Sequence, residues 1–157
     1  MEDKKYYLTK EGLIRVKAEY QHLNKIKILK TSGETPKVWI SEDLNPEYLS
    51  FQEDLAFIET RMIELNNIIK NYQLIKNPPR DKQNIINLGA TVFVEVGNQQ
   101  DQFQIVGSLE ANPSAGRISN ESPVGRALLG HKAGDDVSIS SPISVVYKVK
   151  KIKYSLS

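Results

Sequence analysis

Chemistry in this chain has to rest on carboxylates, because the residue types that serve most other reactions are absent or scarce. The 157 residues contain no Cys and only two His, His22 and His131, which lie far apart in the sequence. Disulfides, thiolate metal sites and cysteine nucleophiles are therefore excluded, and a zinc site would lack ligands. Any metal ion bound by this chain must be held by Asp and Glu oxygens.

Acidic and basic residues are separated along the chain, although the net charge is only +2. Residues 4–37 carry nine Lys or Arg against three Glu, whereas residues 42–64 carry seven Asp or Glu against Arg61 alone. Opposite charges favour antiparallel pairing of the two stretches if they lie side by side. The separation also leaves a basic flank that could face nucleic acid or an acidic protein.

Residues 46–73 have the spacing of a long helix with one apolar seam. Apolar or aromatic residues alternate at intervals of three and four, as in a coiled coil: Tyr48, Phe51, Leu55, Ile58, Met62, Leu65, Ile69 and Tyr72. Asn45 can cap this helix and Pro46 fits its first position, where the missing N–H is not needed. We expect the helix to begin near residue 46 and to end near Gln73, before Pro78.

Residues 10–32 predict a second helix with the same seam. Thr9 is a suitable N-cap, and the seam residues are Leu13, Val16, Tyr20 and Leu23. Lys27 and Lys30 occupy the next seam positions, and Gly33 and Pro36 should end the helix by about residue 32. Two helices of opposite charge, joined by a tip at about 31–45, predict an antiparallel coiled-coil hairpin over residues 1–76.

Beyond a linker at 77–84 the apolar period changes to two. Val92, Val94 and Val96 alternate with other residues, and similar alternation returns toward the C-terminus. Gly97 suits a turn between strands, and residues 123–129 suit one short helix. We therefore predict an α+β fold in which residues 85–157 form a half-buried antiparallel sheet with one short helix. We interpret Lys148, Lys150, Lys151 and Lys153 as a basic strand edge that discourages edge pairing.

The length suits one ordinary domain or two small ones. The content of 39% apolar and 25% charged residues is near the average for globular chains, and no apolar run approaches the roughly 18 residues of a membrane span. The start, residues 1–5, is charged and lacks the apolar segment of a signal peptide. We therefore expect a cytoplasmic protein with no membrane contact.

Several runs of sequence resemble the bacterial GreA/GreB family of transcript cleavage factors. The opening Tyr7-Leu8-Thr9-Lys10-Glu11-Gly12-Leu13 and the segment Phe57-Ile58-Glu59-Thr60-Arg61 resemble the family's N-terminal half. The family's C-terminal half is matched by Leu88-Gly89-Ala90-Thr91-Val92, Ile105-Val106-Gly107, Ile118-Ser119-Asn120-Glu121-Ser122-Pro123-Val124-Gly125-Arg126 and Gly134-Asp135-Asp136-Val137. The matches occur in the family's order and cover most of the chain outside residues 31–45.

The resemblance implies a two-part factor that binds RNA polymerase. In the family, a C-terminal domain similar in fold to FKBP-type isomerases docks at the mouth of the secondary channel, and the coiled coil enters the channel. Acidic tip residues share a Mg²⁺ with the polymerase active site, where the polymerase cuts the nascent 3′ end of backtracked RNA. Two metal ions about 4 Å apart stabilise the entering and leaving oxygens in such a reaction. We therefore expect a monomer that binds no cofactor alone and is not itself an enzyme.

The chain departs from the family at the tip, where it reads Ser41-Glu42-Asp43-Leu44-Asn45-Pro46. Aligned without a gap from Glu47-Tyr48, the family's two acidic positions fall on Ser41 and Leu44. Aligned on Asp-Leu instead, Asp43 takes the first acidic position, and the second acidic position has no equivalent. Asp43, with Glu42 beside it, is the candidate catalytic residue and Mg²⁺ ligand. The alternative is that both carboxylates only stabilise the start of the following helix through its dipole.

The resemblance also implies two contact surfaces. Lys27, Lys30 and Lys37 lie toward the tip, where the family contacts extruded RNA, although a solvated helix face explains most such lysines. Ser122 and Pro123 belong to the polymerase-binding surface in the family. Their local alternative is an N-cap and a first helical residue.

Three other functions compete with transcript cleavage. A related factor could bind polymerase in the same way and regulate or inhibit it without cleavage. A stand-alone prolyl isomerase would use the FKBP-like fold, but fold alone does not transfer activity. A coiled-coil adaptor would bind another helix, and it predicts an exposed apolar seam where the hairpin predicts a buried one.

Overall fold

The computed structural model describes residues 4–33, 46–140 and 143–156, whose contacts divide the chain into two units. Residues 13–71 form the hairpin unit, and the residues up to Gly12 and from Tyr72 onward form the sheet unit. The sequence-based division instead counts 1–76 as hairpin and 77–84 as linker. The difference arises because β1 (Tyr6–Leu8) pairs in parallel with β2 (Tyr72–Leu74), which joins both flanks of the hairpin to the sheet unit.

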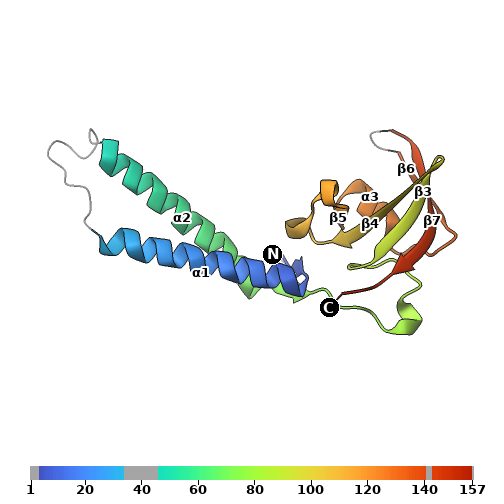
Figure 1. Ribbon diagram of the computed structural model, residues 1–157, viewed down its shortest axis with the longest axis horizontal. Coiled ribbons are helices and arrows are strands. Elements are labelled where there is room, and N and C mark those ends of the chain that lie inside the picture. Colours follow the sequence, from blue (N-terminus) through green and yellow to red (C-terminus); the bar gives the residue numbers. More distant parts are fainter. Residues whose placement is uncertain (1–3, 34–45, 141–142, 157) are drawn as a thin grey trace. The chain divides into compact units, whose positions relative to one another are not determined.

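The hairpin unit consists of two long helices, α1 (Lys10–Ser32) and α2 (Pro46–Lys70), which Figure 1 shows in blue and green. Both start where the sequence predicts, and α1 also ends there. The predicted end of α2 near Gln73 is wrong, since the helix ends at Lys70. The reason is tertiary: the three residues that follow Asn71 pair with β1 and cannot continue the helix.

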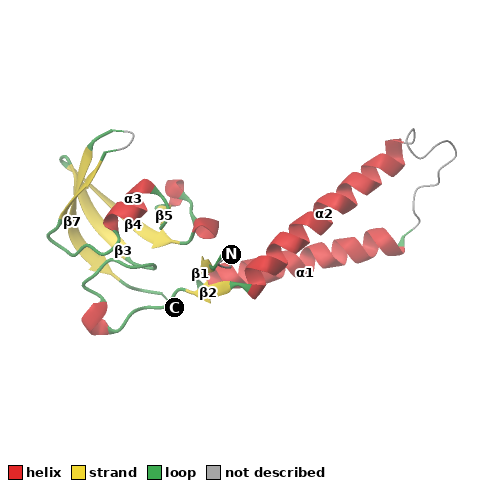
Figure 2. Cartoon of the chain, turned by 180° about the vertical axis from the view of Figure 1, so that it is seen from behind, coloured by secondary structure: helices red, strands yellow, loops and turns green. Residues whose placement is uncertain are grey.

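The apolar seam is closed at one end of the hairpin and open at the other. In α2 the side chains of Ile58, Met62, Leu65 and Ile68 are buried, whereas those of Tyr48, Phe51 and Leu55 are only half-buried. Both views of the ribbon show the two helices separating toward Ser32 and Pro46 (Figure 2). The burial of these four side chains agrees with the buried seam that the hairpin predicts and not with the exposed seam that the adaptor predicts.

The last two predicted seam positions are wrong. Ile68 is 5% exposed and takes the place expected for Ile69, while Tyr72 lies in β2 and is 38% exposed. Two adjacent isoleucines fit a helical period almost equally well, so the spacing alone does not choose between them. The packing of the neighbouring helix decides which one is buried.

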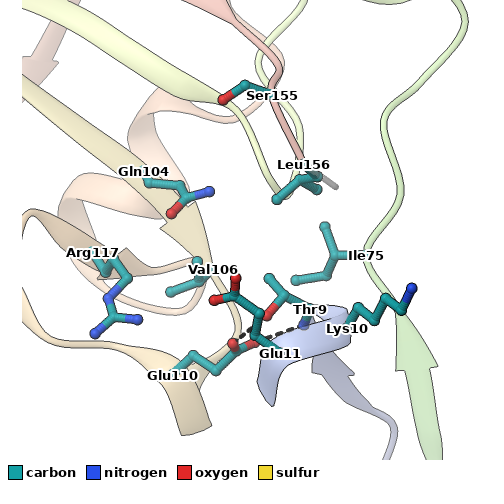
Figure 3. Close-up of a pocket in the computed structure, with 10 residues that line it drawn as sticks. All are labelled: Thr9, Lys10, Glu11, Ile75, Gln104, Val106, Glu110, Arg117, Ser155 and Leu156. Atoms are coloured by element: carbon teal, nitrogen blue, oxygen red, sulfur yellow. Dashed lines mark hydrogen bonds between the residues drawn. The ribbon is translucent and has the colours of Figure 1, made fainter. Parts of the chain in front are cut away.

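The first turn of α1 is held by a residue that lies 101 positions away in the sequence. The Thr9 hydroxyl accepts a hydrogen bond from the Gly12 N–H at 3.1 Å, as an N-cap should. The carboxylate of Glu110 accepts two more, from the Thr9 N–H at 2.7 Å and from the Thr9 hydroxyl (Figure 3). Gly12 makes this possible, because a Cβ there would lie 2.4 Å from Cδ of Glu110.

The sheet unit is built on five strands in the order β5-β4-β3-β7-β6. The strands are β3 (Thr91–Val96), β4 (Gln99–Val106), β5 (Arg117–Ser119), β6 (Asp136–Ile139) and β7 (Val145–Lys153). The short helix α3 (Pro123–Leu128) is where the sequence predicts it, and Gly97, with φ of +61°, makes the turn between β3 and β4. Leu128 of α3 joins the core formed by Val92, Val94, Ile105, Val137 and Val149.

Two sequence-based expectations about this sheet need correction. The sheet is not purely antiparallel, because β4 and β5 pair in parallel after the chain passes through two 3₁₀ turns, Ser108–Glu110 and Pro113–Ala115. β7 is an edge strand over only part of its length, since Val145–Lys148 pair with β6, whereas Lys151–Lys153 pair with β3 alone. Edge protection therefore does not apply to Lys148 and remains an explanation for Lys151 and Lys153. Strand order depends on long-range pairing, which the apolar period does not encode.

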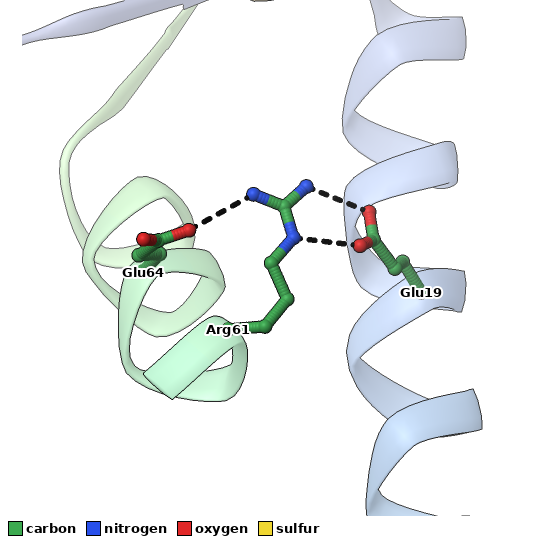
Figure 4. Close-up of polar contacts among 3 residues, drawn as sticks. All are labelled: Glu19, Arg61 and Glu64. Atoms are coloured by element: carbon green, nitrogen blue, oxygen red, sulfur yellow. Dashed lines mark hydrogen bonds and ion pairs between the residues drawn. The ribbon is translucent and has the colours of Figure 1, made fainter. Parts of the chain in front are cut away.

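One ion-pair network links the two helices near the closed end of the seam (Figure 4). The Arg61 guanidinium donates two hydrogen bonds to the Glu19 carboxylate, at 2.7 and 3.1 Å, and one to Glu64 at 3.1 Å. The hydrogen bond from Arg61 holds the pKa of Glu19 below its usual range, and Glu19 raises the pKa of Arg61. The pairing is bidentate, so it restricts the rotation of α2 about its own axis in addition to attracting α2 to α1.

Replacement of Leu65 should weaken the hairpin far more than replacement of its neighbour Ile63. Leu65 is fully buried, so Leu65→Ala should lower the free energy of unfolding by about 2–5 kcal/mol. Ile63 is 64% exposed, and Ile63→Ala should change it by less than about 0.5 kcal/mol. Urea unfolding followed by helical circular dichroism measures both. Equal effects would contradict the seam described here.

Glu19→Gln should destabilise the hairpin at neutral pH but not in acid. The pKa of Glu19 is lower in the folded than in the unfolded chain, so its stabilisation is present above about pH 4.3 and is lost as the pH falls through the folded value. Because both side chains are partly exposed, we expect less than about 1 kcal/mol. Urea unfolding of the two proteins at pH 7 and pH 3 checks this, with Glu53→Gln as the exposed control.

Candidate functional site

The candidate catalytic residues lie outside the described part of the chain. Glu42, Asp43 and the basic residue Lys37 fall within residues 34–45. Their predicted roles in metal and RNA contact therefore stay predictions. What the structure does describe is the end of each helix that leads into this segment, Ser32 in α1 and Pro46 in α2.

The open end of the hairpin forms a shallow hollow of about 470 Å³ between the helices. Its lining combines one cation, two carboxylates and an aromatic ring: Lys30, Pro46, Glu47, Ser50, Phe51 and Asp54. Nζ of Lys30 lies 3.4 Å from the Asp54 carboxylate and 6.0 Å from the centre of the Phe51 ring. The lysine is thus held from two sides by α2.

Lys27 is engaged in the same way one turn earlier. Its ammonium lies 3.5 Å from the Glu59 carboxylate of α2. The Lys27–Glu59 and Lys30–Asp54 ion pairs confirm the prediction that the basic and acidic stretches pair in antiparallel orientation. They also occupy two of the three lysines expected to contact RNA, so a phosphate would have to compete with Glu59 and Asp54 for them.

The lysines at seam positions explain why the hairpin opens. Two lysine side chains take the place of apolar residues at the seam. A lysine keeps its ammonium group in solvent, so it does not pack between the helices as an apolar side chain would. The helices are consequently joined there by partly exposed ion pairs, each worth little. The association of α1 with α2 therefore depends mainly on the apolar packing at the closed end of the seam.

Ser122 and Pro123 open helix α3, as their local interpretation predicts. The Ser122 hydroxyl accepts a hydrogen bond from the Gly125 N–H at 3.1 Å and donates one to the Ser119 carbonyl at 2.7 Å. Ser122 is half-buried and Pro123 is exposed. Pro123 is therefore available for a surface contact, whereas Ser122 has a structural role whether or not it touches a partner.

A polar pocket of about 160 Å³ lies in the sheet unit, beside the first turn of α1 (Figure 3). Its charged lining residues are Lys10, Glu11, Glu110 and Arg117, and its apolar ones are Ile75, Val106 and Leu156. Glu110 is already bound to Thr9. This pocket contains no aromatic side chain, unlike the aromatic-lined pocket expected of a prolyl isomerase.

The aromatic residues of the sheet unit do not converge on one site. Phe103 and Tyr147 meet edge to face, with ring centres 6.2 Å apart, and pack on the core with Tyr154. Tyr154 donates a hydrogen bond to the Ile85 carbonyl at 2.6 Å, and burial raises its pKa. Phe93 is paired with Lys151 across the sheet instead. This arrangement gives no support to isomerase activity.

Metal-ligand clusters and membrane spans are absent from the part of the chain that the structure describes. Among residues 4–33, 46–140 and 143–156, no three His, Asp or Glu side chains are grouped so that they could hold a metal ion. Within the same ranges no helix has the length and apolar character needed to cross a bilayer.

His131 pairs with Asp135 at 3.1 Å, and the Lys132 N–H and His131 hold the pKa of Asp135 below its usual range.

The contact that sequence reasoning missed is Glu110. It lies 101 residues from Thr9, and nothing in its surroundings distinguishes it from another exposed Glu in a turn. A helix N-terminus attracts carboxylates, but the usual partner is three residues away in the sequence. Only the fold shows that Glu110 takes this place.

Comparison with known proteins identifies two family models on this chain. Residues 6–74 match the model described as "Transcription elongation factor, N-terminal", and residues 81–154 match "Transcription elongation factor, GreA/GreB, C-term". The two matches cover nearly all of both units and follow the order predicted from the sequence motifs. They leave out only the linker region and the chain ends.

Two curated relatives agree with this result at the level of sequence. The transcription elongation factor GreA of Thermomicrobium roseum is 40% identical over 137 residues, which are 86% of this chain and 88% of that protein. GreA of Clostridium acetobutylicum is 37% identical over 158 residues, 97% and 99% of the two chains. A crystal structure of GreA factor homolog 1 from Thermus thermophilus covers 96% of this chain and 99% of its own at 25% identity, with a TM-score of 0.42. The sequence matches show that the chain belongs to the GreA/GreB family of transcription elongation factors.

Proposed function

We propose that this protein binds RNA polymerase, inserts its hairpin into the secondary channel and stimulates cleavage of backtracked RNA. The observation that carries the proposal is the match of both family models, in order, over residues 6–74 and 81–154. The protein is a factor and not an enzyme, so the polymerase's own active site cuts the RNA. It would act as a monomer on the elongation complex and the nascent RNA 3′ end.

Asp43 and Glu42 would supply the chemical contribution of this chain. Carboxylate oxygens suit Mg²⁺, and a second Mg²⁺ in the polymerase active site would favour attack of water on the RNA. The chain itself would hold a carboxylate at the end of the hairpin. The buried seam at the opposite end and the Arg61–Glu19 pair support this role, because they fix α2 against α1.

Lys27, Lys30 and Lys37 would contact the phosphates of the extruded RNA. Lys27 and Lys30 are 38% and 31% exposed at their side chains and pair with acids that are more exposed than they are. Such pairs are weak in water, so a phosphate can replace the carboxylate at small cost. The ion pairs would then hold the lysines in place until RNA arrives.

A second candidate function is regulation of polymerase without cleavage. The tip sequence favours it, because Asp43 has no second acidic partner at the position where the family carries one. A factor that reaches the active site with one carboxylate too few would occupy the channel and inhibit the polymerase. The two functions share the docking step and differ only at the tip.

Loss of the tip carboxylates should strongly reduce cleavage and leave binding intact. The Glu42→Ala/Asp43→Ala variant should reduce RNA cleavage in a backtracked complex with Mg²⁺ by about tenfold or more, since metal ligation contributes several kcal/mol to such reactions. Glu53→Ala/Asp81→Ala removes the same charge from exposed positions and should cleave normally. Binding without cleavage by the unmodified protein would instead establish the regulatory function.

Pro123→Arg should weaken polymerase binding by about tenfold without unfolding the sheet unit. Pro123 is exposed at the first position of α3, so a larger charged side chain there disturbs only a partner surface. Pro113→Arg is the matched control, because Pro113 is also exposed and opens a short helix. Ser122→Ala is less suitable, since loss of the cap costs about 1 kcal/mol. Equal binding by both proline variants would exclude this docking surface.

A further inference from the structure

The lysines of β7 gather exposed positive charge on one strand. Lys148, Lys150, Lys151 and Lys153 are all exposed, and β7 pairs with β3 from Tyr147 to Lys153 but with β6 only from Val145 to Lys148. Lysines beside a free edge discourage pairing with another strand. The same four side chains also present a positive surface on one face of the sheet.

A β-bulge places all four lysines on one face of the sheet. The register between β3 and β7 shifts after Phe93, which pairs with Lys151, while Val94 pairs with Val149. Lys150 is thus the extra residue of the bulge. Without a bulge, Lys150 and Lys151 would point to opposite faces. With it, Val149 and Ile152 both pack on the core and both lysines face away from it.

The strands beside β7 complete this outer face. Residues paired across a sheet share a face, so Lys151 lies beside Phe93 of β3, which in turn pairs with Gln102 of β4. Nζ of Lys151 is 5.8 Å from the centre of the Phe93 ring, and Phe93 is half-buried. Lys153 pairs with Thr91, and the same row continues through Gln104 to Arg117. An aromatic ring therefore lies among cationic and amide side chains.

Two carboxylates also lie on this face. Glu95 pairs with Lys148 in register and binds Lys150, with Nζ 3.1 Å from the carboxylate, while Asp136 pairs with Lys148 from β6. They leave Lys151 and Lys153 without a carboxylate partner in these registers, whereas Gln104 and Arg117 line the pocket that Glu11 and Glu110 also line. The positive end of the face therefore lies at Lys151 and Lys153, beside Phe93.

We propose that this outer face of the five-stranded sheet, made of β7 lysines, Phe93 and the β4 glutamines, binds single-stranded nucleic acid. Phosphates would contact Lys148, Lys151 and Lys153, one base would stack on Phe93, and Gln102 would hydrogen-bond to base edges. Aromatic rings and lysines on open sheets bind unpaired bases in this manner. The surface lies on the sheet unit.

The shape of the surface favours a single strand over a duplex. A half-buried ring on a sheet face can reach the flat side of a base only when that base is unstacked. From Lys148 to Lys153 the strand extends about 16 Å, which is long enough for a few nucleotides.

The test is fluorescence anisotropy with the full-length protein and a labelled uridine oligomer of roughly 12 nucleotides, a length within the range that such sheets bind. The unmodified protein should bind with a Kd of roughly 1–100 μM at low salt. Lys148→Ala/Lys151→Ala/Lys153→Ala should weaken binding at least about tenfold and reduce the salt slope by about 2, since each phosphate contact contributes about 0.7. The matched control, Lys17→Ala/Lys82→Ala/Lys132→Ala, removes equal charge from exposed positions elsewhere.

Two single variants separate this site from general charge attraction. Phe93→Leu keeps an apolar strand residue but removes the ring, and it should weaken binding of the oligomer while leaving binding of an abasic DNA strand unchanged. Glu95→Gln removes a negative charge and releases Lys150, so it should strengthen binding several-fold. A gain of affinity cannot come from misfolding.

Each outcome decides the question. Losses confined to the β7 and Phe93 variants support the site, and RNA and DNA oligomers of the same sequence tell which sugar it prefers. An equal loss in the control triple, tighter binding to duplex than to single strands, or no binding by the unmodified protein would overturn it. Circular dichroism of every variant verifies the fold.

Discussion

Apolar packing around Leu65 is the interaction on which the hairpin depends. Toward the other end, Lys27 and Lys30 occupy seam positions, and partly exposed ion pairs to Glu59 and Asp54 join the helices there. Such pairs contribute little free energy, so a short buried segment of α2 holds two long helices together. At the open end the charged side chains therefore stay partly exposed to solvent, where a binding partner can contact them.

Both flanks of the hairpin are anchored in the sheet unit. β1 precedes α1, β2 follows α2, and the two strands pair in parallel with Leu8 fully buried. Glu110 adds a second anchor by accepting both polar hydrogens of Thr9. The first turn of α1 and the strand that follows α2 therefore belong to the same unit that carries Ser122 and Pro123.

The sheet separates two kinds of surface. One face packs with α3 on an aliphatic core, and the other gathers lysines, glutamines and Phe93. The bulge at Lys150 completes the separation. Because Lys150 is an extra residue, Val149 and Ile152 both face the core although they are three positions apart.

Local chemistry determined much of this protein from the sequence. Thr9 and Ser122 cap helices because their hydroxyls reach nearby N–H groups, Pro46 opens α2, Gly97 permits a positive φ, and the family motifs are contiguous. Tertiary structure alone decided what depends on distant partners: the parallel pairing of β1 with β2, the place of β7 between β3 and β6, burial of Ile68 instead of Ile69, and the Thr9–Glu110 contact across 101 residues. The physical reason is that periodicity reports which face of an element is apolar, whereas strand order and long-range hydrogen bonds depend on which other element covers that face.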